Sequence, residues 1–378
     1  MKKLIRFLVF TALVASLALP ALAQNTPTTS TATAATQDDQ EAKTNLYNKF
    51  RDNHKTNPPV AYEAGKEYLS KYEAKDGPTD TYVSYIKKWV DSYEKLARRN
   101  QVIQQLNAKQ YNEAFTGARQ VLADYPDDLA LLFELSKGGL DAATAGNTAN
   151  NAAAIDYARR TLQMIEAGKT FEKDKPIPNK DEIIGALNYE LGFLLRETDP
   201  TGAANYLLAA AQKPGFSQKD PNTYSLLAVA YEKGQYNALA TQYNNQCKAE
   251  DKVDTPECTQ LKARADQVID LMMDALARAI AYSRSSANAA QYEQARTAWM
   301  ESLTNYYKYR KGADTGLNEY IAGITATPLP RPGQAPAPTT TPASNTTTPT
   351  TQPGSTSGTT PPPTNGGTTS STQPKPNR

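Results

Sequence analysis

Apolar and polar residues recur with a helical period from about Asp38 to Gly323. Alanine, leucine, glutamine, lysine and tyrosine dominate this stretch, and no run alternates with period two over the length of a strand. Steps of three and four residues place apolar side chains on one face of a helix, whereas one face of a sheet needs steps of two. The pattern therefore predicts an all-α fold.

Local residues place several helix ends. Asp199-Pro200, Asp220-Pro221 and Thr255-Pro256 each put a capping oxygen before a proline. Proline fits the first helical position because its missing N–H would have had no partner within the helix. Gly234 and Gly312 follow helical stretches, as glycines that end helices do. We expect three helices to begin at these prolines and two to end at these glycines.

Small residues recur at regular intervals in NYELGFLLRETDPTGAANYLLAAAQ, residues 188–212. In a 34-residue unit that begins at Gly185, Leu191 and Gly192 take the seventh and eighth positions. Ala204 and Ala211 then take the twentieth and twenty-seventh. Small residues at such positions let two antiparallel helices approach closely, so this segment predicts a packed helix pair.

Similar units occur elsewhere in the chain. One such unit is LAVAYEKGQYNALATQY, residues 227–243, in which Leu227, Ala228 and Tyr231 take the seventh, eighth and eleventh positions. If one residue is deleted from this unit, Gly234 and Tyr236 fall at the turn between its two helices. In KQYNEAFTGARQVLADYPDD, Ala114, Ala118 and Pro126 take the twentieth, twenty-fourth and thirty-second. Weaker units surround Ala154 and Ala158 and residues 58–72, and insertions at 142–151 and 171–180 lengthen two units.

These positions resemble those of the tetratricopeptide repeat (TPR) family over about residues 45–250. The resemblance implies a right-handed α-solenoid over residues 38–254, with an irregular helical bundle as the alternative. It also implies that a concave groove is lined by fixed positions of each unit, which suit an extended peptide or a partner's helix. The groove positions are Tyr189, Phe193, Arg196 and Glu197 in one unit, and Ser225, Val229, Glu232 and Lys233 in the next.

Residues 255–323 differ from the repeats. One long helix is expected from Thr255 to about Ser285, and a second near Asn288–Lys311 bears Tyr292, Trp299, Leu303 and Tyr306 on one side. A solenoid needs a cover over its last repeat, because an open stacking face would expose an apolar patch. We interpret both helices as that cap. The alternative is a coiled-coil dimerisation seam along Leu261, Ala265, Val268, Met272, Ala275 and Ala279.

The two ends of the chain have their own compositions. Residues 1–23, MKKLIRFLVFTALVASLALPALA, combine a basic start, an apolar stretch and a small-residue cleavage site, which is typical of a secretory signal peptide. Residues 24–37 are expected to be a disordered linker. Residues 324–378 are expected to be a disordered tail, since residues 326–378 hold 13 prolines, 16 threonines and no aromatic residue. The mature protein should be exported, to the periplasm or the cell surface, without a transmembrane anchor.

Cys247 and Cys258 are the only cysteines, and a pair in an exported protein usually forms a disulfide. The segment between them, KAEDKVDTPE, joins the last repeat to the long helix. A disulfide here would fix the angle between the repeats and the cap.

The remaining chemistry argues against most enzyme classes. The only histidine, His54, lies in a polar stretch and is expected at the surface, so a catalytic triad or a histidine zinc site is excluded. No phosphate-binding glycine loop indicates a cofactor, and no basic stripe indicates nucleic acid. Much of the excess of 22 tyrosines is explained by packing within repeats. We expect a non-catalytic scaffold that binds an unidentified protein partner; the alternatives are a carboxylate-pair hydrolase acting on envelope polysaccharide, or a surface protein whose tail is the working part.

Overall fold

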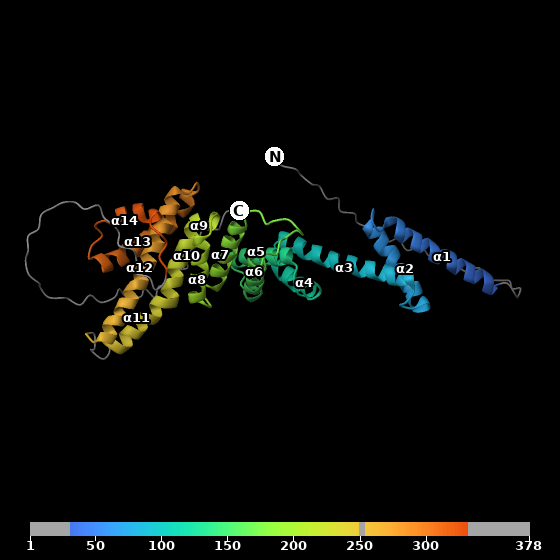
Figure 1. The fold of residues 1–378 in the computed structure, drawn as a ribbon, viewed down its shortest axis with the longest axis horizontal. Helices are drawn as coiled ribbons and strands as arrows, with labels where there is room; N and C mark the ends of the chain where they lie inside the picture. Colours follow the sequence, from blue (N-terminus) through green and yellow to red (C-terminus); the bar gives the residue numbers. More distant parts are fainter. Residues whose placement is uncertain (1–30, 249–253, 332–378) are drawn as a thin grey trace, which may run out of the picture. The chain divides into compact units, whose positions relative to one another are not determined.

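The computed structural model describes residues 31–248 and 254–331, which are helical almost throughout and contain no strand (Figure 1). The predicted all-α class is therefore confirmed for these residues. The predicted signal peptide, residues 1–23, lies outside the described residues, as does the tail from residue 332 onward. Contacts between Cα atoms divide the chain into unit 1, residues 1–94, and unit 2, residues 95–378.

Unit 1 consists of α1 (Thr31–Asn53), α2 (Pro58–Asp76) and the first part of α3 (Thr81–Asn107). Helices α1 and α2 form a packed pair. The apolar faces of the three helices meet in one core made of Phe50, Ala61, Ala64, Tyr68, Tyr72, Val83, Ile86 and Val90.

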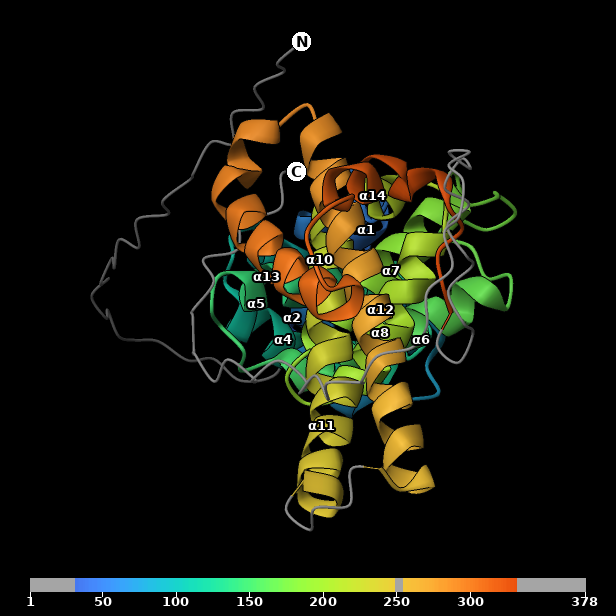
Figure 2. The same cartoon turned by 90° about the vertical axis from the view of Figure 1, so that its left-hand side faces the viewer.

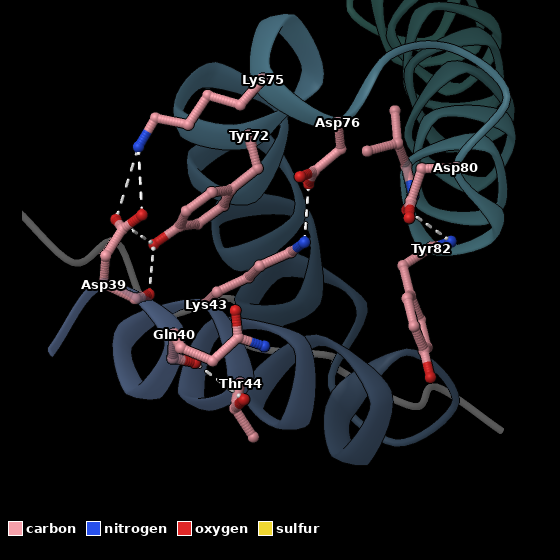
Figure 3. A network of polar contacts seen from close by, with 10 residues as sticks. Asp39, Gln40, Lys43, Thr44, Tyr72, Lys75, Asp76, Asp80 and Tyr82 are labelled. Atoms are coloured by element: carbon pink, nitrogen blue, oxygen red, sulfur yellow. Dashed lines mark hydrogen bonds and ion pairs between the residues drawn. The ribbon is translucent and has the colours of Figure 1, made fainter. Parts of the chain in front are cut away.

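Polar contacts hold α1 against α2 (Figure 3). The Lys43 ammonium lies 2.7 Å from Asp76, and the hydrogen bond to that carboxylate raises the pKa of Lys43. Asp39 accepts hydrogen bonds from the Tyr72 hydroxyl and from Lys75. The linker expected at residues 24–37 is wrong in its last part, because helix α1 already begins at Thr31. Residues 24–30 lie outside the described residues.

Unit 2 is built mainly from consecutive helices that lie side by side (Figure 1). Helix α5 packs on α6, α6 on α7, and α7 on α8, which in turn contacts α10. After α3, these helices are α4 (Tyr111–Asp124), α5 (Leu129–Thr144), α6 (Asn151–Glu166), α7 (Lys180–Leu195), α8 (Pro200–Gln212), α9 (Phe216–Lys219) and α10 (Pro221–Tyr231).

Glycine allows the closest approaches between paired helices. A Cβ atom on Gly192 of α7 would lie within 3.0 Å of Leu207 on α8, and one on Gly139 of α5 would lie as close to Ala154 on α6. Real Cβ atoms do not approach neighbours so closely, so a larger side chain would force the helices apart. Ala204 and Ala211 are also buried, at 2% and 4% exposure. The helix pair predicted from the small-residue spacing of residues 188–212 is thus confirmed.

The predicted helix starts are confirmed. Asp199 accepts a hydrogen bond from the backbone N–H of Gly202 at 2.9 Å, and Asp220 accepts one from that of Asn222 at 3.1 Å. The Thr255 hydroxyl accepts one from the backbone N–H of Cys258 at 3.3 Å. The helix end at Gly312 is confirmed as well, since this residue has the left-handed conformation typical of such glycines.

The turn predicted at Gly234 and Tyr236 is wrong. The chain continues as one helical segment through α10, the π-helical turn η1 (Glu232–Tyr236), α11 (Asn237–Tyr243) and a second π-helical turn, η2 (Asn244–Lys248). Gly234 is instead required for close packing. A Cβ atom added at this position would lie 2.9 Å from Thr201 Oγ1 and 3.0 Å from Thr201 N. The glycine allows the start of α8 to approach this helix.

Helix α12 (Pro256–Ser285) packs along α10 and α11. Its starting half projects together with α11 beyond the other helices of unit 2 (Figure 2). The apolar seam from Leu261 to Ala279 is buried within this chain, which leaves it unavailable as a dimerisation seam. The second expected helix is present as the short η3 (Ala289–Tyr292) and α13 (Glu293–Lys311), followed by α14 (Leu317–Gly323) and η4 (Ile324–Ala326).

The boundary predicted between residues 323 and 324 is too early. The buried Arg278 guanidinium pairs with Asp274 at 2.7 Å and donates hydrogen bonds to the backbone carbonyls of Thr327 and Pro328 at 2.9 and 3.1 Å. Leu329 packs against a small core that includes Tyr224. The start of the Pro/Thr-rich region therefore belongs to the fold, because a buried arginine and an apolar pocket hold it.

We predict that Gly192→Ala lowers the free energy of unfolding by about 1–3 kcal/mol, because the new methyl group collides with Leu207. Thermal unfolding should show a lower Tm. Gly323→Ala is the matched control, since no atom lies within 4 Å of its Cβ position. Equal Tm values for the two variants would contradict the close contact of α7 and α8.

Candidate functional site

The predicted groove residues lie on two neighbouring helical segments, α7 with its end, and α10 with η1. The Lys233 ammonium lies 2.7 Å from the Glu197 carboxylate, which joins the two segments at the surface. Val229 of α10 is 37% exposed. The structure therefore brings Glu197 and Lys233 together. We call Arg196, Glu197, Val229, Glu232 and Lys233 the α7–α10 surface.

Tyr189 and Phe193 require a correction, because both are buried, at 8% and 6% exposure. The Arg196 guanidinium covers the Phe193 ring at 3.8 Å from its centroid and donates a hydrogen bond to the Phe193 carbonyl. Phe193 thus supports a stacked arginine, and a ligand would meet the arginine first. Ser225, at 6% exposure, is likewise too buried to line an open groove.

The η3–α13 segment covers part of the same region. The Tyr292 hydroxyl donates a hydrogen bond to buried Asp220 at 3.4 Å. Further along, Glu232 is half-buried, and Tyr306 is near enough to influence its pKa. Burial raises the pKa of Asp220 to about 6, and burial also raises the pKa of Glu232. Periodicity could not reveal this cover, because it gives no information on where a helix distant in sequence returns.

Glu190 is an unusual buried acid on another face of α7. It is 4% exposed, and its Oε2 atom has no hydrogen-bond partner among the described residues. Burial raises its pKa to about 8. A carboxyl group that is enclosed in this way cannot reach a substrate, so its role is in stability.

The aromatic side of unit 1 was missed by the sequence analysis. Tyr82, Tyr85, Trp89 and Tyr93 follow one another on α3 at steps of three and four residues, which places them on one side of the helix. Tyr82 and Tyr85 are 48% and 45% exposed, and the other two are half-buried. We call these four residues the aromatic face. The spacing was visible in the sequence, but the tyrosines were attributed to packing.

Ring contacts support the aromatic face from below. The fully buried Phe50 lies 5.8 Å from Tyr85 and 5.2 Å from Trp89, measured between ring centroids. Trp89 stacks on Tyr93 at 5.4 Å, and Tyr47 meets Tyr82 edge-on at 4.6 Å. His54, half-buried beside Phe50, uses Nδ1 in a hydrogen bond to the Arg51 carbonyl.

An open depression between α11 and α12 is lined by amide, arginine and apolar side chains and by no carboxylate: Gln235, Ala238, Leu239, Gln242, Arg264, Gln267, Val268 and Leu271. No group of three or more His, Cys, Asp or Glu side chains within the described ranges could hold a metal ion. None of the described helices is both long and apolar enough to cross a membrane.

The predicted disulfide between Cys247 and Cys258 is confirmed, with 5.7 Å between the two Cα atoms. It joins the end of η2 to the first turn of α12, and both sulfur-bearing residues are buried. The bond therefore closes the end of the α11–α12 pair that projects from unit 2.

Comparisons of the chain with protein-family models, with curated protein sequences and with solved structures give no match.

We predict that replacing both cysteines, Cys247→Ser and Cys258→Ser, lowers the free energy of unfolding by about 3 kcal/mol at most, because the disulfide closes a short loop. Urea unfolding should show the same decrease in the free energy of unfolding for the variant and for the reduced wild-type protein. An unchanged unfolding midpoint in both would contradict a stabilising role for the disulfide.

We predict that Glu190 makes stability depend on pH. Its folded pKa of about 8 exceeds the ordinary glutamate value of 4.5, so between these pH values the folded state holds a proton that the unfolded chain has lost. The free energy of unfolding should then fall with rising pH in this window, by at most about 1.4 kcal/mol per pH unit. Glu190→Gln should make this slope shallower, leaving the part that comes from other buried acids such as Asp220, and should make the protein more stable at pH 8.

Denaturant unfolding from pH 5 to pH 8 measures this slope. Glu113→Gln on the exposed side of α4 is the control and should keep the wild-type slope. Parallel curves for wild type and Glu190→Gln would show that Glu190 is ionised in the folded protein.

Proposed function

We propose that this chain is a non-catalytic scaffold of the bacterial cell envelope that binds a protein partner on TPR-like stacked helix pairs. The signal-like residues 1–23 and the disulfide support export, because disulfides persist outside the reducing cytoplasm. The pairs α5–α6 and α7–α8, with their glycine contacts, support the repeat arrangement.

The contact between Glu197 and Lys233 is the observation that carries this proposal. These residues take the same, thirteenth, position in two successive units and lie 2.7 Å apart. Equivalent positions of neighbouring repeats lie side by side in a stack, because each unit repeats the orientation of the one before it. Arg160 likewise donates a hydrogen bond to the Pro126 carbonyl, 34 residues earlier. Such contacts favour one continuous surface over an irregular bundle.

The α7–α10 surface has the mixed character of a protein-binding site. Arg196 is held flat on Phe193, Val229 is exposed, and Lys233 and Glu197 present opposite charges at the surface. Arginine on an aromatic support is a common hot-spot residue, since little side-chain entropy remains to be lost on binding. The surface suits a peptide or helix with an apolar side chain between charged ones.

The two alternatives find less support. A hydrolase needs two accessible carboxylates in a cleft, whereas the open depression between α11 and α12 has none and Glu190 and Asp220 are buried. A protein whose tail is the working part would lose its function on removal of residues 332–378, and the scaffold proposed here would keep its partner.

We predict that Arg196→Ala combined with Val229→Ser and Lys233→Ala weakens partner capture at least about tenfold, because the anchors of the α7–α10 surface are lost. The full mature chain serves as bait in envelope extracts. The matched control combines Arg159→Ala, Leu96→Ser and Lys169→Ala, which replaces exposed residues of the same kinds elsewhere.

A partner that the wild-type and control chains capture and the variant loses supports the scaffold. Equal capture by all three chains, or no capture by the wild-type chain, contradicts this proposal. Matching circular dichroism spectra are required, so that unfolding is not mistaken for lost binding.

A further inference from the structure

The aromatic face of α3 lies on a different unit from the α7–α10 surface, and nothing described covers its first half. Tyr82 and Tyr85 keep nearly half of their surface exposed although buried Val83 and Ile86 lie next to them on the same helix. Exposed aromatic groups that lie in a row are costly in water, and they commonly mark interaction sites.

The face is a narrow, straight row. Tyr82 and Tyr93 are eleven residues apart on one continuous helix, which corresponds to about 16 Å along the helix axis. An extended polyproline II segment advances about 3.1 Å per residue, so roughly five residues would span the row. Segments of this kind dock on rows of aromatic side chains in several unrelated domains.

The hydrogen-bonding groups also match such a ligand. The structure shows no hydrogen bond from the hydroxyl groups of Tyr82 and Tyr85 to other described residues. Both hydroxyls can therefore donate to a ligand. A proline-rich segment offers mainly acceptors, because its carbonyls make no internal hydrogen bonds and proline has no N–H.

The rings are held in place before a ligand arrives. Asp80 caps α3 by accepting hydrogen bonds from the backbone N–H groups of Tyr82 and Val83, both at 2.9 Å (Figure 3). Phe50 supports Tyr85 and Trp89 from the core side. Tyr62 contacts Tyr93 at 4.8 Å and donates a hydrogen bond to Glu94. A rigid row loses little side-chain entropy on binding, which favours even a short ligand.

We propose that the aromatic face binds a proline-rich segment, and that its ligand is the Pro/Thr-rich tail of this protein. Residues 332–378 hold 11 prolines and no acidic or aromatic residue, and TTPPPT, residues 359–364, contains three consecutive prolines. The six residues of this stretch match the length of the row. A covalently attached ligand is present at high effective concentration, so modest contacts suffice for occupancy. Because this argument rests on covalent attachment, the tail that occupies the face is that of the same molecule.

The test uses a labelled peptide of residues 355–368 and fluorescence anisotropy with the full mature chain. In the wild-type chain, the protein's own tail competes with the peptide for the aromatic face. The triple variant Pro361→Ala, Pro362→Ala and Pro363→Ala weakens this competition, so it should bind the peptide more tightly than the wild-type chain does. Adding Tyr82→Ala and Tyr85→Ala should weaken peptide binding about tenfold or more, because two aromatic contacts are lost.

Control variants and a control peptide test whether binding requires the tyrosine rings and the prolines. Tyr125→Ala removes a tyrosine that is 43% exposed in unit 2, and it should change peptide binding less than twofold. Tyr82→Leu with Tyr85→Leu keeps apolar bulk on α3 and should still lose binding, which separates loss of the rings from damage to the fold. A peptide in which alanines replace the three prolines should not bind.

Sedimentation of the wild-type chain distinguishes the two sources of the tail. A mass that stays constant with concentration supports binding within one molecule, whereas a mass that rises with concentration, and does not in the triple proline variant, overturns it in favour of binding between copies. No peptide binding, or binding that survives the tyrosine substitutions, overturns the proposal. A soluble glycan fragment that binds the face when the peptide does not also overturns it. The substitutions on the α7–α10 surface that are predicted to weaken partner capture should not change binding of the peptide to the aromatic face, so the two proposals are tested separately.

Discussion

The fold of unit 2 depends on how closely its paired helices approach one another. At Gly192 and Leu207, and again at Gly139 and Ala154, no room exists for a larger side chain on the glycine. Dispersion and burial increase steeply with such contact, since a gap of even half an ångström loses much of the attraction. The approach of α7 to α8 in turn sets where α10 packs against α8 and where the surface residues of α7 and α10 lie. A binding surface made from several helices requires this regular spacing.

The same constraint explains the continuous helix from Pro221 to Lys248. Gly234 lies where the start of α8 presses against that helix, so the glycine provides space and the helix continues past it. Two π-helical turns adjust the register of the following residues. Helix α12 packs along the resulting length, and the disulfide closes the far end of the pair. The C-terminal helices then pack against α12, and the Tyr292 hydroxyl reaches Asp220 at the start of α10.

Features that depend on residues close together in the sequence, such as helix starts, could be predicted from the sequence. Capping oxygens before prolines placed the starts of α8, α10 and α12, and the cysteine pair was recognised from its context. Features that depend on distant segments were missed. Burial of Tyr189 requires knowing where η3 returns, and the ordered path of Leu329 requires knowing that Arg278 holds it. The aromatic face was predictable from its spacing alone, but only exposure distinguishes a binding face from a packing face. Spacing placed Glu197 and Lys233 on neighbouring helical segments, but it could not show that Tyr189 and Phe193 are buried.

Amide hydrogen exchange of the full chain, with and without its captured partner, tests the central claim most directly. The account predicts slower exchange in the partner-bound protein at residues 193–197 and 229–233 together, because one ligand would contact both helices of the α7–α10 surface. Slower exchange that is confined to other segments, with these two unchanged, would contradict it.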